Sequence, residues 1–304
     1  MPCLSIIVPH LNDDSGLEVT LLSILENRES DFEVLIAHDG GFTDPYGLGQ
    51  DEAVLIESSR GASLSSQINL AVASACSPYI QVLMPGSTVD ERWFDEAIEI
   101  LDGSTVSAVC MPIEDAQSEK VFVGLASDSL PHRRLSSDVN AATVPLMCGG
   151  VFRKKTFRAI GGWFDHSSTE VSEVELGLLI MALRLEIATA SNVGLHAPKR
   201  VAVGHEPGFE IGRACGQLAC AFASIEDSGI AIDSLARRLG HLASGLMSPK
   251  TVAERLGWVM GIRERAFVRT VQARVELASE AMAEKRSTIT LPNATRAQEQ
   301  RRAA

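Results

Sequence analysis

The sequence predicts an α/β protein with a mostly parallel sheet flanked by helices and extended by a helical region at the C-terminal end. Strand-like and helix-like apolar runs alternate over the first hundred residues. Repeated strand–helix units with short loops fold into parallel sheets with right-handed crossovers. From Phe209 onward the apolar residues recur at helical spacing instead.

The composition is that of an ordinary soluble globular chain. The 304 residues are 45% hydrophobic and 22% charged, enough for one large domain or a domain with an appendage. The net charge of −12 disfavours a nucleic-acid-binding surface. The six cysteines show no CxxC or metal-finger spacing, and no leader or apolar run of ~20 residues occurs. We therefore expect a cytoplasmic protein that binds no nucleic acid.

The first two strands place polar residues at their carboxyl ends. Residues 4–9 are almost entirely apolar, and residues 12–15 are Asn, Asp, Asp and Ser, the types that cap helices. Apolar residues at helical spacing follow over 16–27, and a second strand is expected at 32–37, ending on His38-Asp39-Gly40-Gly41. Open α/β sheets build nucleotide sites at this edge.

The alternation continues and then loosens. Further strands are expected at 53–56 and 79–83, and helices at 63–76 and from the capping-box spacing Thr88-Val89-Asp90-Glu91 to Leu101. The later elements are strand-like pieces at 106–112, 121–126, 144–152 and 200–204, a helix at 171–185, and one long amphipathic helix from Trp258 to Met282. We expect an α/β domain over 1–206, a helical region over 207–287 and a disordered tail over 288–304.

Five short segments and one histidine are spread over residues 4–206. The segments are Ser5-Ile6-Ile7-Val8-Pro9 with Asn12, 33–40, Arg60-Gly61 with Asn69, 79–83, and Gly161-Gly162-Trp163-Phe164-Asp165, and the histidine is His205, after a later strand. In this order they resemble the family 2 glycosyltransferases, inverting enzymes with the GT-A fold. The resemblance implies transfer of a sugar from a nucleotide diphosphate, a UDP-sugar first of all, to a saccharide or lipid-linked acceptor. Such enzymes build cell-surface polysaccharides.

The donor site is expected at Pro9, Asn12, Asp39, Asn69 and Ser87. A base and ribose need a few directed polar groups at strand ends. Asp39 can accept a hydrogen bond from a uracil N–H or a ribose hydroxyl, and the turn from Pro9 to Asn12 can shape the base pocket. The alternative for Asp39 is that it only makes a turn with the glycine that follows.

The metal site of the family has no intact counterpart. The family binds Mn²⁺ or Mg²⁺ through a DxD motif, where this chain has Met84-Pro85-Gly86. Neither Met nor Gly offers the oxygen ligands of a hard cation. The metal site is therefore absent or rebuilt, and Ser87 supplies one oxygen. The resemblance places His205 at the metal or the diphosphate, where an imidazolium could stabilise the leaving group without metal; a structural role is the alternative.

The catalytic base is expected in the helix that begins near Val171. Inversion is a single displacement in which a carboxylate removes the proton of the attacking hydroxyl. The resemblance aligns Ser172-Glu173 with the family's acidic pair, which makes Glu173 the first candidate and Glu175 the second. Leu179 replaces the arginine that the family often carries one turn later. The alternative is that these acids only complement the helix dipole.

Two other hypotheses stay open. The departures at His38, Met84-Pro85-Gly86, Ser172 and Leu179 are compatible with a catalytically inactive GT-A scaffold that binds a nucleotide or a protein partner. An unrelated nucleotide-binding enzyme is disfavoured, because neither GxGxxG nor a Walker motif occurs. From Trp258 onward nine Lys/Arg face five Asp/Glu. This region is expected to pack on the sheet domain or to contact the inner face of the membrane peripherally.

Overall fold

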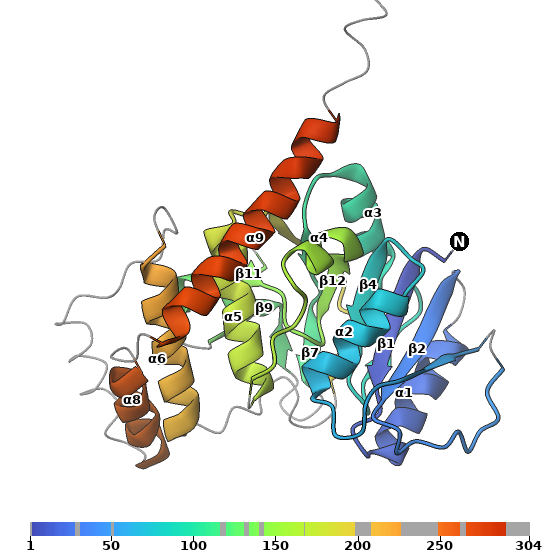
Figure 1. The fold of residues 1–304 in the computed structure, drawn as a ribbon. Coiled ribbons are helices and arrows are strands. Elements are labelled where there is room, and N and C mark those ends of the chain that lie inside the picture. The colour runs from blue at the N-terminus through green and yellow to red at the C-terminus, as the bar shows by residue number, and fades with distance from the viewer. Residues whose placement is uncertain are drawn as a thin grey trace, which may run out of the picture.

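The computed structural model describes most of the chain. The described residues are 2–27, 31–49, 52–115, 120–130, 134–139, 143–166, 168–197, 208–225, 249–261 and 266–289. The strand predicted at 200–204, His205, the expected domain boundary at 206/207 and nearly all of the predicted tail lie outside them. Figure 1 shows a central sheet flanked by helices, with the C-terminal helices gathered beside α5.

A seven-stranded sheet forms the centre, with the strand order β13-β6-β12-β4-β1-β2-β3. Its strands are β1 Leu4–Pro9, β2 Phe32–His38, β3 Val54–Glu57, β4 Tyr79–Val82, β6 Ala108–Cys110, β12 Gly150–Arg153 and β13 Ile187–Thr189. Neighbouring strands pair in parallel, except that β12 runs antiparallel between β4 and β6. The mostly parallel sheet predicted from the sequence is confirmed.

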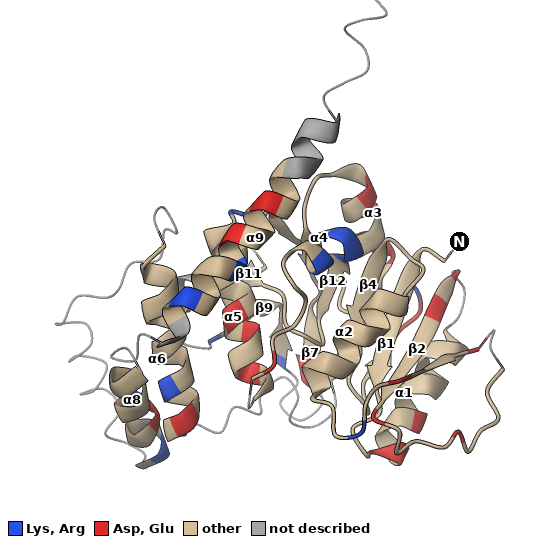
Figure 2. Ribbon diagram, viewed as in Figure 1, with Lys and Arg blue, Asp and Glu red and all other residues tan. Residues whose placement is uncertain are grey.

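Helices cover this sheet, and several of them begin at a side-chain cap. They are α1 Asp14–Glu26, α2 Leu64–Ser74, α3 Asp95–Gly103, α4 Lys154–Ala159 and α5 Thr169–Ala182. Asp13 caps α1 by accepting a hydrogen bond from the Gly16 N–H at 2.9 Å. Ser63 caps α2 through the Ser66 N–H at 3.2 Å. Figure 2 shows acidic residues on α1 and on the loops beside it, and basic residues on α4.

The prediction of a helix starting at Thr88 is wrong. Thr88–Val89 is strand β5, and α3 begins at Asp95. The Val89 N–H donates to the Ser23 hydroxyl of α1 at 2.8 Å, and the Asp90 N–H donates to the Gly194 carbonyl at 2.9 Å. Tertiary hydrogen bonds of the backbone therefore replace the local capping box.

Two small sheets complete the α/β part. One has the order β5-β14-β7-β8, with β7 Ile113–Asp115, β8 Lys120–Phe122 and β14 Leu195–Ala197. The other has the order β10-β9-β11, with β9 Gly124–Ala126, β10 Leu135–Ser136 and β11 Thr143–Val144. The strands predicted at 121–126 and 144–152 are thus each divided, because their two halves pair in different sheets.

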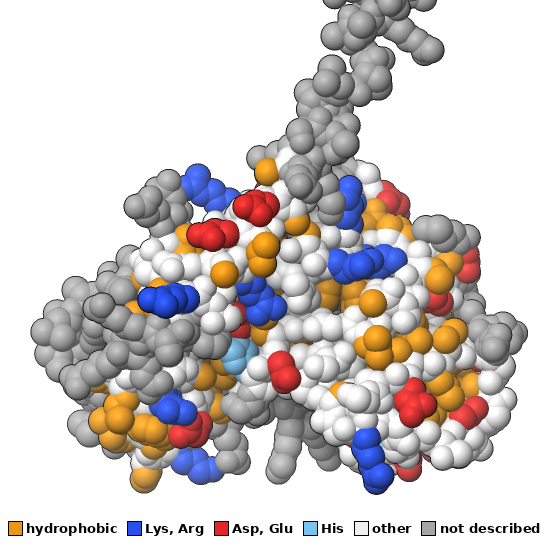
Figure 3. Space-filling view, viewed as in Figure 1, with side chains coloured by type: hydrophobic (Ala, Val, Ile, Leu, Met, Phe, Trp, Pro, Cys, Tyr) orange, Lys and Arg blue, Asp and Glu red, His pale blue; other side chains and the backbone are white. Residues whose placement is uncertain are grey.

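The described parts of the C-terminal region are helical, as predicted, and the predicted long helix corresponds to two helices of the structure. The helices are α6 Phe209–Ala223, α8 Pro249–Gly261 and α9 Ala266–Ile289. Trp258 of α8 and Val271 of α9 are buried in the same core as Phe222 of α6. Figure 3 shows exposed hydrophobic side chains over α8, where Leu256 and Met260 are 51% and 54% exposed. Among the described helices, none is long and apolar enough to cross a membrane.

Candidate functional site

The carboxyl ends of β1 and β2 bring three predicted donor residues together. Pro9 ends β1 and is in register with Ala37 of the parallel neighbour β2. The turn that follows has left-handed backbone at Leu11 and Asn12, with φ of 50° and 55°. A Cβ on Gly41 would lie 3.3 Å from Oδ1 of Asp39 and 3.9 Å from Oδ1 of Asn12. Both side-chain oxygens therefore face the same short loop.

Asp39 also connects this edge to the loop before α2. Its Oδ2 accepts a hydrogen bond from the Gly61 N–H at 3.3 Å. The Arg60-Gly61 segment of the sequence resemblance thus lies beside Asp39. The contact explains how a carboxylate on a strand end keeps a fixed orientation while remaining partly exposed.

A group of rings lines the same edge and was not predicted. The ring of Phe42 lies 4.8 Å from that of His10 and 5.8 Å from that of His38, between centroids. His10 is 5% exposed, and its Nε2 lies 2.6 Å from Oδ1 of Asp14. Apolar ring surface next to a directed carboxylate is the chemistry that a nucleobase requires. The signal in the sequence was the position of His10 and His38 directly at the strand ends.

The turn after β4 is packed onto α1 and carries no carboxylate. The Gly86 N–H donates to the Gly16 carbonyl at 2.7 Å, and the Thr20 hydroxyl donates to the Met84 carbonyl at 3.3 Å. Ser87 is 1% exposed. Within the described ranges, no group of three or more His, Cys, Asp or Glu side chains is arranged to bind a metal. The described residues of this turn do not fit a hard cation.

Asp90, the nearest acid after this turn, is engaged elsewhere. Its Oδ2 lies 3.2 Å from Nε2 of His196, and Oε2 of Glu114 lies 2.9 Å from Nδ1 of the same ring. The two carboxylates thus contact opposite nitrogens and do not converge on one point. This arrangement links β5, β14 and β7 across the small sheet.

Glu173 lies on α5 and faces the loop before β12. Its side chain is buried, and Oε1 accepts a hydrogen bond from the Met147 N–H at 2.9 Å. Because β12 runs antiparallel to β4, the loop before β12 lies at the carboxyl edge of β4. Glu173 is therefore directed to the edge of the sheet that carries Asp39.

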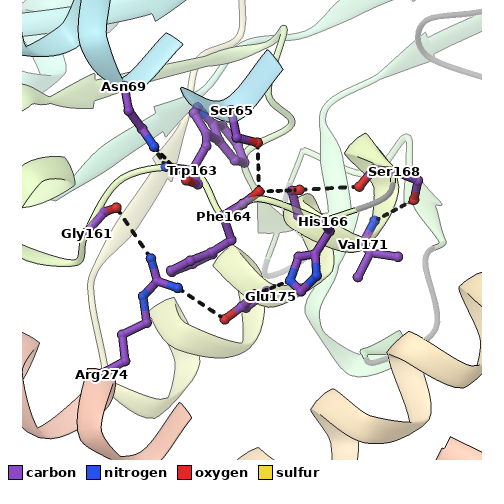
Figure 4. Close-up of polar contacts among 11 residues, drawn as sticks. Ser65, Asn69, Gly161, Trp163, Phe164, His166, Ser168, Val171, Glu175 and Arg274 are labelled. Atoms are coloured by element: carbon purple, nitrogen blue, oxygen red, sulfur yellow. Dashed lines mark hydrogen bonds and ion pairs between the residues drawn. The ribbon is translucent and has the colours of Figure 1, made fainter. Parts of the chain in front are cut away.

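Glu175 faces a different part of the molecule. Its buried carboxylate contacts Nε2 of His166 through Oε2, and Oε1 lies 3.7 Å from Nη1 of Arg274 on α9 (Figure 4). The structure thus separates the two candidate bases. Glu173 faces the loop at the carboxyl edge, whereas Glu175 is paired with the C-terminal helix.

Asn69 (Figure 4) and Ser172 hold the segment that connects α4 to α5. The Asn69 amide donates to the Trp163 carbonyl at 2.7 Å and accepts from the Trp163 N–H at 2.9 Å. The Phe164 carbonyl accepts from the hydroxyls of Ser172 and Ser65, each at 2.7 Å. Asn69 is therefore directed to this segment and not to Asp39. Ser172, which aligns with the first acid of the family pair, carries a hydroxyl that makes a structural hydrogen bond.

Gly162 → Ala should destabilise the protein by about 2–3 kcal/mol. Gly162 has φ of 72°, and an added Cβ would lie 2.2 Å from Oδ1 of Asn69. Gly47 → Ala is the matched control, because Gly47 has φ of 64° and no atom within 4 Å of an added Cβ. The control should lose only about 1 kcal/mol. Urea unfolding of the two variants measures both values, and equal losses would contradict the Asn69–Trp163 clamp.

Most of the chain is similar in fold to solved structures of S. aureus TarS. TarS 1–349 in complex with UDP-GlcNAc matches with a TM-score of 0.58 and 12% identity, over 95% of this chain and 92% of that chain. The UDP complex matches with a TM-score of 0.54 and 11% identity, over the same 95% and 92%. A longer TarS structure, of which 55% is covered, matches with a TM-score of 0.51 and 11% identity over 92% of this chain.

At these identities the similarity concerns the fold alone, and it confirms the GT-A fold class predicted from the sequence. No protein-family model matches the chain, and no curated protein sequence matches it.

Proposed function

We propose that this chain is a glycosyltransferase that takes its sugar from a UDP-sugar bound at the carboxyl ends of β1 and β2. The observation that carries the proposal is the convergence of Asn12 and Asp39 on one loop, next to the ring of Phe42. It occurs in a fold shared with a protein solved with UDP and with UDP-GlcNAc.

The base pocket follows from the chemistry of uracil. An imide N–H and ribose hydroxyls are donors, so they need an acceptor such as the Asp39 carboxylate. The rings of His10 and Phe42, which are almost fully buried, pack against each other beside it and make this edge apolar. Pro9 and Asn12 define the shape of the turn below the base. Ser87 lies on the buried turn after β4, where the sugar diphosphate would pass.

Glu173 is the proposed general base of an inverting transfer. Its carboxylate takes the proton of the acceptor hydroxyl while that oxygen forms a bond to the anomeric carbon and the bond to UDP breaks. The hydrogen bond from the Met147 N–H orients the carboxylate toward the edge that holds the donor. Glu175 serves the structure instead, because its partners are His166 and Arg274.

The transfer is proposed to proceed without Mn²⁺ or Mg²⁺. The turn of Met84-Pro85-Gly86 offers no carboxylate, and Asp90 is engaged by His196. No step is therefore assigned to a metal. His205 lies outside the described residues, and its contact with the diphosphate stays a prediction from the sequence.

The acceptor is proposed to be a saccharide or a lipid-linked saccharide. A lipid-linked acceptor would bring the protein to a membrane surface, where the exposed Leu256 and Met260 of α8 provide apolar contacts. Peripheral binding to anionic vesicles, measured by co-sedimentation, tests this part separately.

Thermal unfolding with UDP and with a panel of nucleotide sugars, each in EDTA, Mg²⁺ or Mn²⁺, tests the donor and the metal together. UDP at 100 times its Kd should stabilise the fold by about 2.7 kcal/mol. We expect the same stabilisation in EDTA as in Mn²⁺. Stabilisation by UDP without turnover of any UDP-sugar would support the inactive scaffold. No stabilisation by any nucleotide would contradict the proposed donor site.

A further inference from the structure

Arg274 reaches from the C-terminal helix α9 into the segment between α4 and α5. Its Nη1 lies 3.7 Å from Oε1 of Glu175, and its Nη2 donates to the Gly161 carbonyl at 3.4 Å. The guanidinium also lies over the ring of Phe164 (Figure 4). One side chain of α9 thus contacts Gly161, Phe164 and Glu175, which lie on both sides of the start of α5.

Glu175 requires this contact because its side chain is only 2% exposed. A buried carboxylate without a charged partner is strongly destabilising. His166 contacts one oxygen of the Glu175 carboxylate. Arg274 supplies a positive charge next to the other oxygen, and the charge of a guanidinium does not change with pH in the neutral range. Burial lowers the pKa of Arg274, and the attraction of Glu175 opposes that effect. A guanidinium nevertheless remains charged at neutral pH.

The surroundings of Arg274 and of Gly161 both allow this contact. Arg274 lies among Val271, Val275 and Ala278 on the buried face of α9. On the other side, Gly161 has φ of 87°, and an added Cβ would lie 3.0 Å from Nη2 of Arg274. The lack of a side chain at this position leaves room for the guanidinium beside the Gly161 carbonyl.

The same segment is hydrogen-bonded to the residue next to Glu173 on α5. The Phe164 carbonyl accepts a hydrogen bond from the hydroxyl of Ser172, the residue directly before Glu173. Arg274 covers the ring of that same Phe164. Arg274 and Glu173 are therefore connected through Phe164 and Ser172, while the Asp39 pocket lies on other elements of the fold.

We infer that Arg274 is a positioning residue and that α9 is required for catalysis, because it holds the segment 161–175 in the arrangement that directs Glu173 at the acceptor. The inference rests on the proposed function. It assigns the C-terminal helix a role in turnover and none in donor binding.

The test uses the full chain with Arg274 → Met and Arg274 → Lys. Arg269 → Met is the matched control, because Arg269 is exposed on the same helix. We expect Arg274 → Met to lower kcat for UDP release from a UDP-sugar at least tenfold, with the Kd of UDP changed less than twofold. Arg274 → Lys should recover part of kcat, and the control should match the unchanged protein. An unchanged kcat in Arg274 → Met would overturn the inference.

Hydrogen exchange separates a failure of this inference from a failure of the proposed function. Amides of residues 161–166 should exchange faster in Arg274 → Met than in Arg269 → Met, whether or not any UDP-sugar is turned over. Equal exchange in the two variants would overturn the positioning role. If Arg274 → Met does not fold, the double variant Glu175 → Gln, Arg274 → Met removes both charges, and the same losses of kcat and of protection are expected from it.

Discussion

Replacing Glu173 with Gln should lower the turnover of a UDP-sugar by about 10²–10⁴-fold, the usual contribution of a general base. The substitution keeps the size of the side chain, and an amide oxygen can still accept the hydrogen bond from the Met147 N–H. It removes the negative charge of the side chain and with it the ability to take a proton. The measurement is kcat for UDP release, with the Kd of UDP determined by calorimetry on the same preparation.

Glu170 → Gln is the matched control for this prediction. Glu170 lies in the first turn of the same helix α5 and carries the same charge. We expect the control to retain kcat and both variants to retain the affinity for UDP. Retained kcat in Glu173 → Gln would remove Glu173 as the base. A loss of equal size in Glu170 → Gln would mean that the charge at the helix start matters and not the position of Glu173.

Replacing Asp39 with Asn should weaken the binding of UDP by about 10–100-fold. Hydrogen bonds to a charged acceptor contribute about 1.5–3 kcal/mol, and each 1.4 kcal/mol corresponds to a factor of ten in Kd. The amide keeps the volume and can still accept from the Gly61 N–H, the contact that Asp39 makes with the loop before α2. Calorimetric titration with UDP measures the change.

The control for Asp39 is Glu18 → Gln, an equal change of charge on the exposed surface of α1. Its Kd for UDP should match that of the unchanged protein. If both variants weaken UDP binding equally, the effect is one of net charge and Asp39 is no specific acceptor. An unchanged Kd for UDP in Asp39 → Asn would mean that the uracil base and the ribose bind elsewhere.

Local sequence patterns predicted those parts of the fold that depend on neighbouring residues. The runs that became β1, β2 and β4 are apolar and bounded by polar loops, and α1 begins at an acid that caps it. The start of α3 was predicted wrongly, because Val89 and Asp90 bond to α1 and to Gly194, which are distant in sequence. The antiparallel direction of β12 likewise follows from tertiary pairing.

The candidate site could be predicted where topology alone brings residues together. Pro9, Asn12 and Asp39 follow two parallel neighbouring strands, so their proximity follows from the sheet. The difference between Glu173 and Glu175 could not be predicted, because it depends on which side of α5 faces Met147 and which faces α9.

Arg274 could not be predicted either. It lies 99 positions after Glu175 in the sequence, and only the packing of α9 brings the two side chains together. Its own surroundings in the sequence are typical of an exposed arginine on an amphipathic helix.

The most direct test of the central claim is the release of UDP from a panel of UDP-sugars in EDTA, with the unchanged protein and Glu173 → Gln side by side. The proposed function predicts release of UDP from at least one UDP-sugar by the unchanged protein, at the same rate in EDTA as in Mn²⁺, and its loss in Glu173 → Gln. Absence of UDP release from every UDP-sugar and acceptor combination, in EDTA and in Mn²⁺ alike, would contradict it.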